Sequence, residues 1–225
     1  PFFWCESLTA FNVDEGNPYF KSIDGSIYSK DGTVLIEYPA GRSDDLILPD
    51  SVVKVAELAI AGTDIVNFHI GKNLSEIEGD QGLTELYYLK SFTVHPENEH
   101  FSAIGGHLYS KDGKVLIKYA TDAEGPLFVL PDFVERIEKD AFTDCYKVRH
   151  LVMGPNIKSN GGSSAYMYTI IALKGTSHDV IWGISVSVVF IEDVNCTLGQ
   201  DEGVPYVTSF TKTNEFLDYA GNPYR

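Results

Sequence analysis

Short runs in which apolar and polar residues alternate recur along the chain. Each run reads apolar, two other residues, apolar, one other residue, apolar, and four segments have it in full: Leu8 to Val13, Ile65 to Ile70, Leu89 to Val94 and Val148 to Met153. Alternate residues of a β-strand face the same side. The last apolar pair of each run therefore points into a core, and the residue between them points to solvent.

The runs return at regular intervals. Two shorter copies keep only the final apolar pair, Leu46 with Leu48 and Phe128 with Leu130. Phe68 follows Leu46 by 22 residues, and Phe92 follows Phe68 by 24. This pattern at a period between about 20 and 29 residues is the signature of a leucine-rich repeat. Such strands cannot bury their apolar face alone and are stabilised by stacking on one another. The pattern predicts a leucine-rich-repeat solenoid of short β-strands.

A longer duplication contains this smaller repeat. The segment 11–38 (FNVDEGNPYFKSIDGSIYSKDGTVLIEY) matches 92–119 (FTVHPENEHFSAIGGHLYSKDGKVLIKY), which lies 81 residues later. Apolar runs flank an Asp-Gly pair in both copies, which predicts a β-hairpin in each. We expect two hairpin insertions at one edge of the solenoid, where they either cover the edge of the core or form binding loops.

The segments that return from one strand to the next match as well, LPDSVVKVAELAI at 48–60 and LPDFVERIEKDAF at 130–142. Pro49 and Pro131 end strands because proline cannot donate a hydrogen bond to a β-ladder. The mixed spacing of three and four between apolar residues favours irregular or short helical returns.

The repeat stops after Ile157, where NGGSS at 160–164 indicates a turn or linker. Segments 166–173 and 180–191 are rich in β-branched and aromatic residues, which predicts strands. We therefore expect a solenoid over residues 1–159 and a β-rich C-terminal cap or small domain over residues 160–225.

Several of these stretches together resemble the BspA-like leucine-rich repeats of bacterial and protozoan surface proteins. The stretches are the spacing of Phe2, Cys5 and Leu8, its counterpart at Phe142, Cys145 and Val148, the L-P-x-x-V-x-x-I pattern, and the insertion from Gly16 to Pro39. The resemblance covers roughly residues 1 to 159. It implies a curved solenoid without enzymatic activity that is exported to the cell surface and adheres to host matrix proteins or other cells.

Charge and composition narrow the classes of partner that the chain could bind. The chain has 32 acidic and 17 basic residues, a formal net charge of -15, which argues against nucleic acid and against an anionic membrane surface. Apolar runs are too short for membrane insertion by this segment. The three cysteines are spaced too widely for a disulfide framework or a zinc site. Cys5 and Cys145 hold equivalent repeat positions, so we expect both to be buried free thiols.

No catalytic residue, cofactor or metal site is expected. The six histidines have no metal-ligand spacing, and neither a nucleophile elbow nor a phosphate-binding loop occurs. The outward side chains of the strands are therefore the candidates for binding a partner. The candidate binding residues are Asn12, Asn67, His69, Ser91, Thr93 and His150, and Val152 is also expected to face outward. Ordinary solvated surface residues are the alternative.

The expected function is a secreted or cell-surface binding or adhesion module that recognises a host or matrix protein or glycoprotein. One alternative is a structural spacer or display region of a larger surface protein. Another is an enzyme or glycan-processing accessory protein with the C-terminal segment as its active part. Exposed hairpins and sheet edges could also pair between two copies, so a homodimer is a further expectation.

Overall fold

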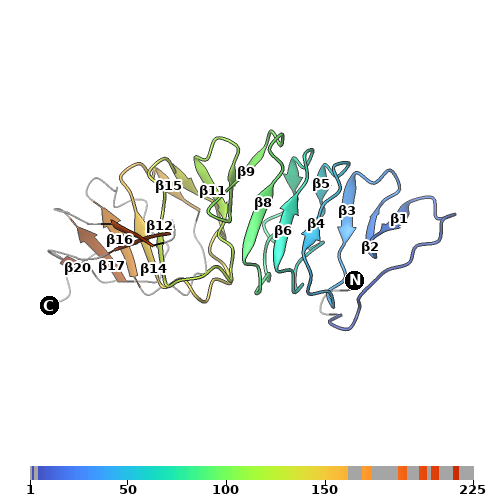
Figure 1. The fold of residues 1–225 in the computed structure, drawn as a ribbon, viewed down its shortest axis with the longest axis horizontal. Coiled ribbons are helices and arrows are strands. Elements are labelled where there is room, and N and C mark those ends of the chain that lie inside the picture. The colour runs from blue at the N-terminus through green and yellow to red at the C-terminus, as the bar shows by residue number, and fades with distance from the viewer. Residues whose placement is uncertain are drawn as a thin grey trace.

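The structure, a computed structural model, describes residue 2, residues 5–161 and the backbones of five strands beyond them. The strands lie side by side, across the long axis of an elongated molecule (Figure 1). The described residues form strands, turns and loops, and none of them forms a helix that could cross a membrane. This part of the chain is the predicted leucine-rich-repeat solenoid. Its strands form two layers, each made of two separate hydrogen-bonded sheets, which we call the front sheet and the return sheet.

The front sheet holds the strands that the apolar runs predict. Its first part is parallel and contains β4 (Leu46–Ile47), β6 (Asn67–Ile70) and β8 (Ser91–Val94). Its second part contains β12 (Leu127–Val129), β14 (His150–Met153), β16 (Thr169–Leu173), β17 (Ser187–Ile191) and the antiparallel β20 (Glu215–Leu217). The register repeats from strand to strand, since Leu46 pairs with Phe68 and Phe68 pairs with Phe92.

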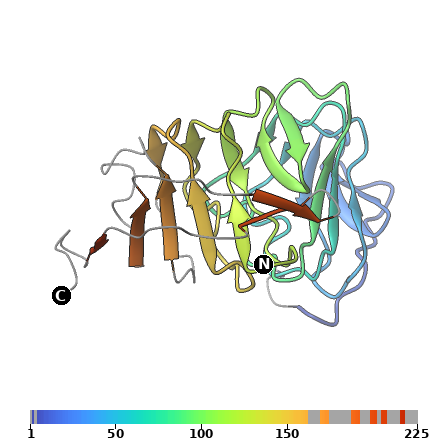
Figure 2. The ribbon, with the colours of Figure 1, turned by 60° about the vertical axis from the view of Figure 1, so that its left-hand side comes forward.

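The C-terminal strands extend this second part. The predicted strands at 166–173 and 180–191 coincide in part with β16 and β17, whose backbones pair parallel beyond β14 (Figure 2, orange to brown). The remaining residues of those two segments lie outside the described part of the chain. A separate antiparallel pair, β18 (Leu198–Asp201) and β19 (Val204–Val207), brings β19 against β12.

The return sheet lies behind the front sheet and also has two parts. The first contains β1 (Phe20–Ile23), β2 (Ser26–Ser29), β3 (Val34–Glu37), β5 (Lys54–Val55) and β7 (Glu76–Ile77). The second contains β9 (Phe101–Ile104), β10 (His107–Ser110), β11 (Val115–Lys118), β13 (Arg136–Ile137) and β15 (Ser159–Asn160).

Both predicted hairpins are present, β2 with β3 and β10 with β11, and each gains a third strand, β1 or β9. The last strand of each insertion pairs parallel with the next return strand, as β3 does with β5. Leu35 and Leu116 of these strands are fully buried. The strands of the insertions therefore cover the core.

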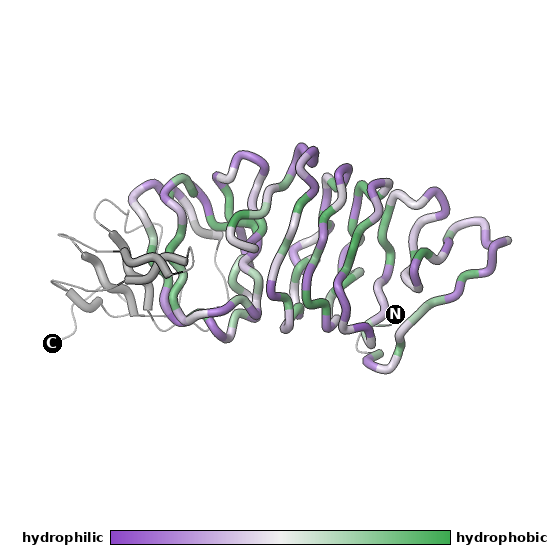
Figure 3. The backbone as a smooth tube through the Cα atoms, in the orientation of Figure 1, coloured by the Kyte–Doolittle hydropathy of each residue, from purple (hydrophilic) through white to green (hydrophobic). Residues whose placement is uncertain are grey.

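The returns are irregular, and no described residue adopts the helical alternative. Val55 and Ile137 are buried, β-branched residues that pair with strands on both sides. Such residues favour extended backbone, and the adjacent return strands supply the hydrogen bonds that a helix would otherwise make internally. Hydrophobic residues follow the strands and hydrophilic residues gather at the bends (Figure 3).

The front sheet is interrupted where each insertion begins. At what we call the second break, between β8 and β12, the turn at Gly105 and Gly106 intervenes, and Phe92 N donates a 2.8 Å hydrogen bond to Gly106 O. The first break lies between segment 11–13 and β4, where Phe11 N donates a 2.7 Å hydrogen bond to Gly25 O. Gly25 and Gly106 have φ of 72° and 80°, which glycine adopts without strain.

The core divides at the second break into two clusters, with Leu108 in the first and Tyr109 in the second. Cys145 belongs to the second cluster and is fully buried, as expected, and burial raises the pKa of its thiol to about 12. The same expectation is wrong for Cys5, which is exposed. Cys196 lies outside the described residues.

Candidate functional site

A row of polar side chains crosses the first part of the front sheet. It contains Asn67 and His69 on β6, Ser91 and Thr93 on β8, and Asp45 just before β4. The strand register pairs Asn67 with Ser91 and His69 with Thr93. Parallel strands lie about 4.8 Å apart, so side chains paired in this way are close enough for hydrogen bonds. We call these five residues the strand-face ladder.

Hydrogen bonds join all five residues of the ladder. Asn67 Nδ2 donates to Asp45 Oδ1 at 2.8 Å, and Ser91 Oγ donates to Asn67 Oδ1 at 2.7 Å. His69 Nδ1 lies 2.6 Å from Thr93 Oγ1, and His69 Nε2 lies 3.5 Å from Asp45 Oδ2. A neutral imidazole with its proton on Nε2 would donate toward Asp45 and accept from the Thr93 hydroxyl.

The ladder stays open to solvent. The side chains of His69 and Asp45 are 35% and 44% exposed. Ile47, which pairs with His69, is 69% exposed and places an apolar side chain beside the polar row. The mutual hydrogen bonds restrict the side-chain conformations, which lowers the entropy cost of binding a partner there. The surface thus offers ordered polar groups next to an apolar anchor.

The structure brings together four of the six candidate binding residues, Asn67, His69, Ser91 and Thr93. Asn12 is exposed in the segment on the far side of the first break. His150, on β14, is separated from the ladder by the second break and by β12.

The expectation that Val152 faces solvent is wrong, because Val152 is 3% exposed. The adjacent strand β12 has β19 against it, so this end of the front sheet is covered.

Asp45, which connects the two halves of the ladder, was not among the candidate residues. Its spacing could have revealed it, since Asp45 precedes Asn67 by 22 residues, as Leu46 precedes Phe68.

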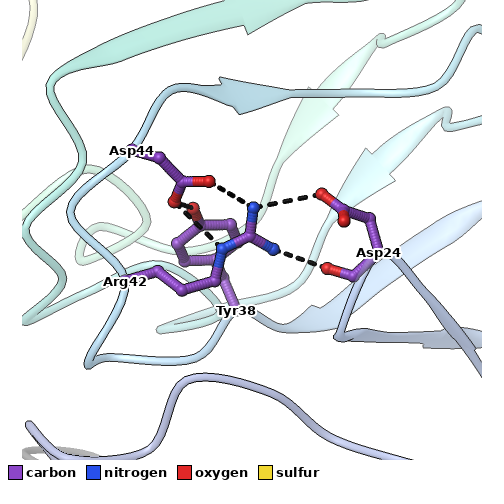
Figure 4. Close-up of polar contacts among 4 residues, drawn as sticks. All are labelled: Asp24, Tyr38, Arg42 and Asp44. Carbon is purple, nitrogen blue, oxygen red and sulfur yellow. Dashed lines mark hydrogen bonds and ion pairs between the residues drawn. The ribbon is translucent and has the colours of Figure 1, made fainter.

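A second cluster closes the first break. Figure 4 shows the Arg42 guanidinium between Asp44 and Asp24, with Nε donating to Asp44 Oδ1 at 2.9 Å and Nη2 donating to Asp24 Oδ2 at 3.0 Å. Arg42 Cζ lies 5.0 Å from the centre of the Tyr38 ring, and the Tyr38 hydroxyl donates to Asp44 at 2.7 Å. The hydrogen bond from Arg42 lowers the pKa of Asp44 to about 2. Arg42 therefore fills this break with a side chain of the protein itself.

Within the described residues, no group of three His, Cys, Asp or Glu side chains is placed to hold a metal ion. The ladder contains one imidazole and one carboxylate, and they are joined to hydroxyl and amide groups. Such an arrangement can donate and accept hydrogen bonds on a broad, open surface.

Comparisons with known proteins complete the description. No protein-family model matches the chain, and no curated protein matches it. Among solved structures, a leucine-rich cell-surface protein from Faecalibacterium prausnitzii is 27% identical, with a TM-score of 0.49 over 60% of this chain and 40% of the other.

Two further solved structures are similar. The pneumococcal vaccine antigen PcpA is 20% identical, with a TM-score of 0.45 over 76% of this chain. A leucine-rich-repeat protein from Eubacterium ventriosum is 13% identical, with a TM-score of 0.45 over 72% of this chain. The chain spans 40% of PcpA and 62% of the Eubacterium protein, and so less than two thirds of each of the three.

Proposed function

We propose that the protein is an extracellular or cell-surface binding module, of the BspA-like kind, that recognises a protein or glycoprotein through the strand-face ladder. The observation that supports this proposal is the ordered ladder with exposed Ile47 beside it. Protein interfaces combine apolar anchors with polar groups whose hydrogen bonds set specificity.

Adhesion is the form of binding that we propose, with host or matrix proteins as partners. The net charge of -15 favours a partner whose contact surface is neutral or basic, because like charges facing each other destabilise a complex. The front sheet presents its side chains over several strands at once, which suits an extended protein or glycoprotein surface better than a small molecule.

We also propose that the ladder binds without catalysing a reaction. Thr93, His69 and Asp45 follow the hydroxyl, imidazole and carboxylate order of a nucleophilic triad. The contact between His69 and Asp45 is long, at 3.5 Å, and both side chains are open to water. Neither His69 nor Thr93 lines the pocket of about 390 Å³ beside β12. An activated nucleophile needs a site that excludes water and stabilises an oxyanion.

The test is a binding array of the purified chain against matrix proteins, mucins and glycans at near-physiological salt. We expect a saturable hit that weakens at least about tenfold in His69→Ala or Asn67→Ala, as for residues at the centre of an interface. His100→Ala is the matched control, because His100 is an exposed histidine outside the ladder. Binding to no member of the panel, or equal weakening in the control, would favour the spacer function instead.

A further inference from the structure

A carboxylate and an apolar side chain stand next to each other at the β4 end of the strand-face ladder. Asp45 and Ile47 are both exposed, and Leu46 between them is buried, so the two point outward on the same face. Residues two apart in an extended chain lie roughly 7 Å from each other. Asn67 adjoins Asp45 through a hydrogen bond, and His69 adjoins Ile47 through the strand register.

The hydrogen bonds from β8 across β6 run toward Asp45. Ser91 Oγ donates its single proton to Asn67 Oδ1, and Asn67 Nδ2 donates to Asp45 Oδ1. An ionised carboxylate can only accept, and a serine oxygen that has donated its proton can still accept. The positions left for a partner on Asp45 and Ser91 are therefore acceptors, which favours a partner that supplies hydrogen-bond donors.

Both carboxylate oxygens of Asp45 keep room for a further hydrogen bond. An ionised carboxylate has about four acceptor positions. Asn67 occupies one position on Oδ1, and His69 Nε2 lies 3.5 Å from Oδ2. The Asp45 side chain is 44% exposed, and among the described residues no lysine or arginine forms an ion pair with it. A cation from outside can therefore reach both oxygens at once.

The preceding residue shows what two such oxygens can accept. Arg42 donates to both oxygens of Asp44, with Nε 2.9 Å from Oδ1, while the Tyr38 hydroxyl also donates to Oδ1 at 2.7 Å. A guanidinium presents its N–H groups as a fork that matches a carboxylate, whereas a lysine ammonium is a point charge. Asp45 offers a similar pair of oxygens, but the described part of the chain supplies no guanidinium for them.

Ile47 favours a cation that is carried on an apolar stem. Its side chain is 69% exposed beside the polar row. The methylene groups of an arginine lie along apolar surface while the charged head reaches a polar partner, and their length suits the separation of Ile47 and Asp45. The net charge of -15 adds a general attraction for basic partners.

We propose that the Asp45 end of the strand-face ladder binds an arginine side chain of a protein partner, with the guanidinium on the Asp45 carboxylate and the methylene stem on Ile47. The proposal rests on the proposed function and deepens it, because it names the chemistry that the ladder recognises. An uncharged glycan has no such fork of donors, so binding of glycans at Asp45 is the competing outcome.

The test selects peptides from a display library of random 12-residue sequences on the purified chain at near-physiological salt, with counterselection on Asp45→Asn. We expect the enriched peptides to share an arginine. In a synthetic copy of one enriched peptide, replacing this arginine by citrulline, its uncharged analogue, should raise the dissociation constant at least about tenfold, because a charge-assisted hydrogen bond is lost. Lysine should weaken binding by a smaller factor, because it keeps the charge without the fork.

Variants of the protein then locate the contact. Asp45→Asn should weaken binding of the arginine peptide at least about tenfold and leave binding of the citrulline peptide unchanged. Ile47→Ser should weaken both peptides several-fold, because both carry the same methylene stem. Glu99→Gln is the control, because it removes the same charge from an exposed side chain outside the ladder. All four proteins should unfold at similar temperatures, since the three replaced side chains are exposed.

The proposal is overturned if no peptide is enriched over the Asp45→Asn counterselection, if the enriched peptides lack arginine, or if the citrulline peptide binds equally well. Equal weakening in Glu99→Gln, or binding of uncharged glycans that Asp45→Asn abolishes, would overturn it as well. The proposed function is tested separately, by the binding array. A partner in the array that depends on His69 but binds Asp45→Asn as tightly as the wild type would support the ladder and refute the arginine site.

Discussion

Lowering the pH should destabilise the protein through His107. Its pKa falls from 6.5 to about 4 on burial, a difference of about 2.5 units. One unit corresponds to about 1.4 kcal/mol, so the free energy of unfolding should lose about 3 kcal/mol from this group. The folded state disfavours the charged form. The contribution is therefore complete above about pH 6.5 and is lost as the pH falls toward about 4.

The assay is urea unfolding followed by circular dichroism between pH 7 and pH 4, for the wild type and for His107→Phe. A phenyl ring can keep the stack on Tyr119, and the lost hydrogen bond from Ala120 N to His107 Nδ1 adds a cost that does not change with pH. Carboxylates titrate alike in both proteins, so the difference between the two curves isolates His107. If the difference in the free energy of unfolding between the two proteins stays constant from pH 7 to pH 4, the imidazole of His107 is not buried in its neutral form and the reasoning is refuted.

Four further substitutions test the packing and the polar anchors. Phe68→Ala removes a fully buried ring that lies 5.8 Å from Phe92, and should lower the free energy of urea unfolding by about 3 to 5 kcal/mol. Arg42→Ala should cost only about 1 to 2 kcal/mol in the same assay, because its carboxylate partners are largely exposed. Its effect should shrink as the pH falls from about 4 toward 2, where Asp44 protonates. Asn98→Ala removes a fully buried amide that donates to Gly71 O and Leu74 O and accepts from His100 N and Phe101 N. It should lower the free energy of unfolding by about 3 kcal/mol, measured by thermal unfolding. Asn17, its counterpart in the first copy, accepts only two such bonds, so Asn17→Ala should lower the free energy of unfolding by about 1 kcal/mol.

The strands of the front sheet could be predicted because their apolar spacing reports burial directly. Phe68 and Phe92 are buried, as the pattern requires, and the residues between the apolar positions form the ladder. The conformation of the return segments is harder to predict, because an apolar spacing of three and four residues suits a helix as well as an irregular return. Pairing of Val55 with neighbouring strands decides the outcome, and this pairing depends on residues about 20 positions away.

The sequence predicts only part of the candidate site, because the rest also depends on residues far apart in the chain. Asn67 and Thr93 lie at outward positions that a local pattern identifies, whereas His150 is separated from them by an insertion whose place in the front sheet no local pattern reports. Arg42 lies just outside the regular strands, where periodicity gives no signal. The Tyr109 hydroxyl is recognisable as unpaired only when all its neighbours are placed.

The two breaks also bear on how such a protein can change over generations. Arg42 and Ala123 occupy matching places, and neither side chain takes part in strand pairing. A side chain at either place can therefore change without removing a hydrogen-bonding group of the strands. A lineage that duplicates such units can preserve one copy that supports folding while the side chains of the other copy drift.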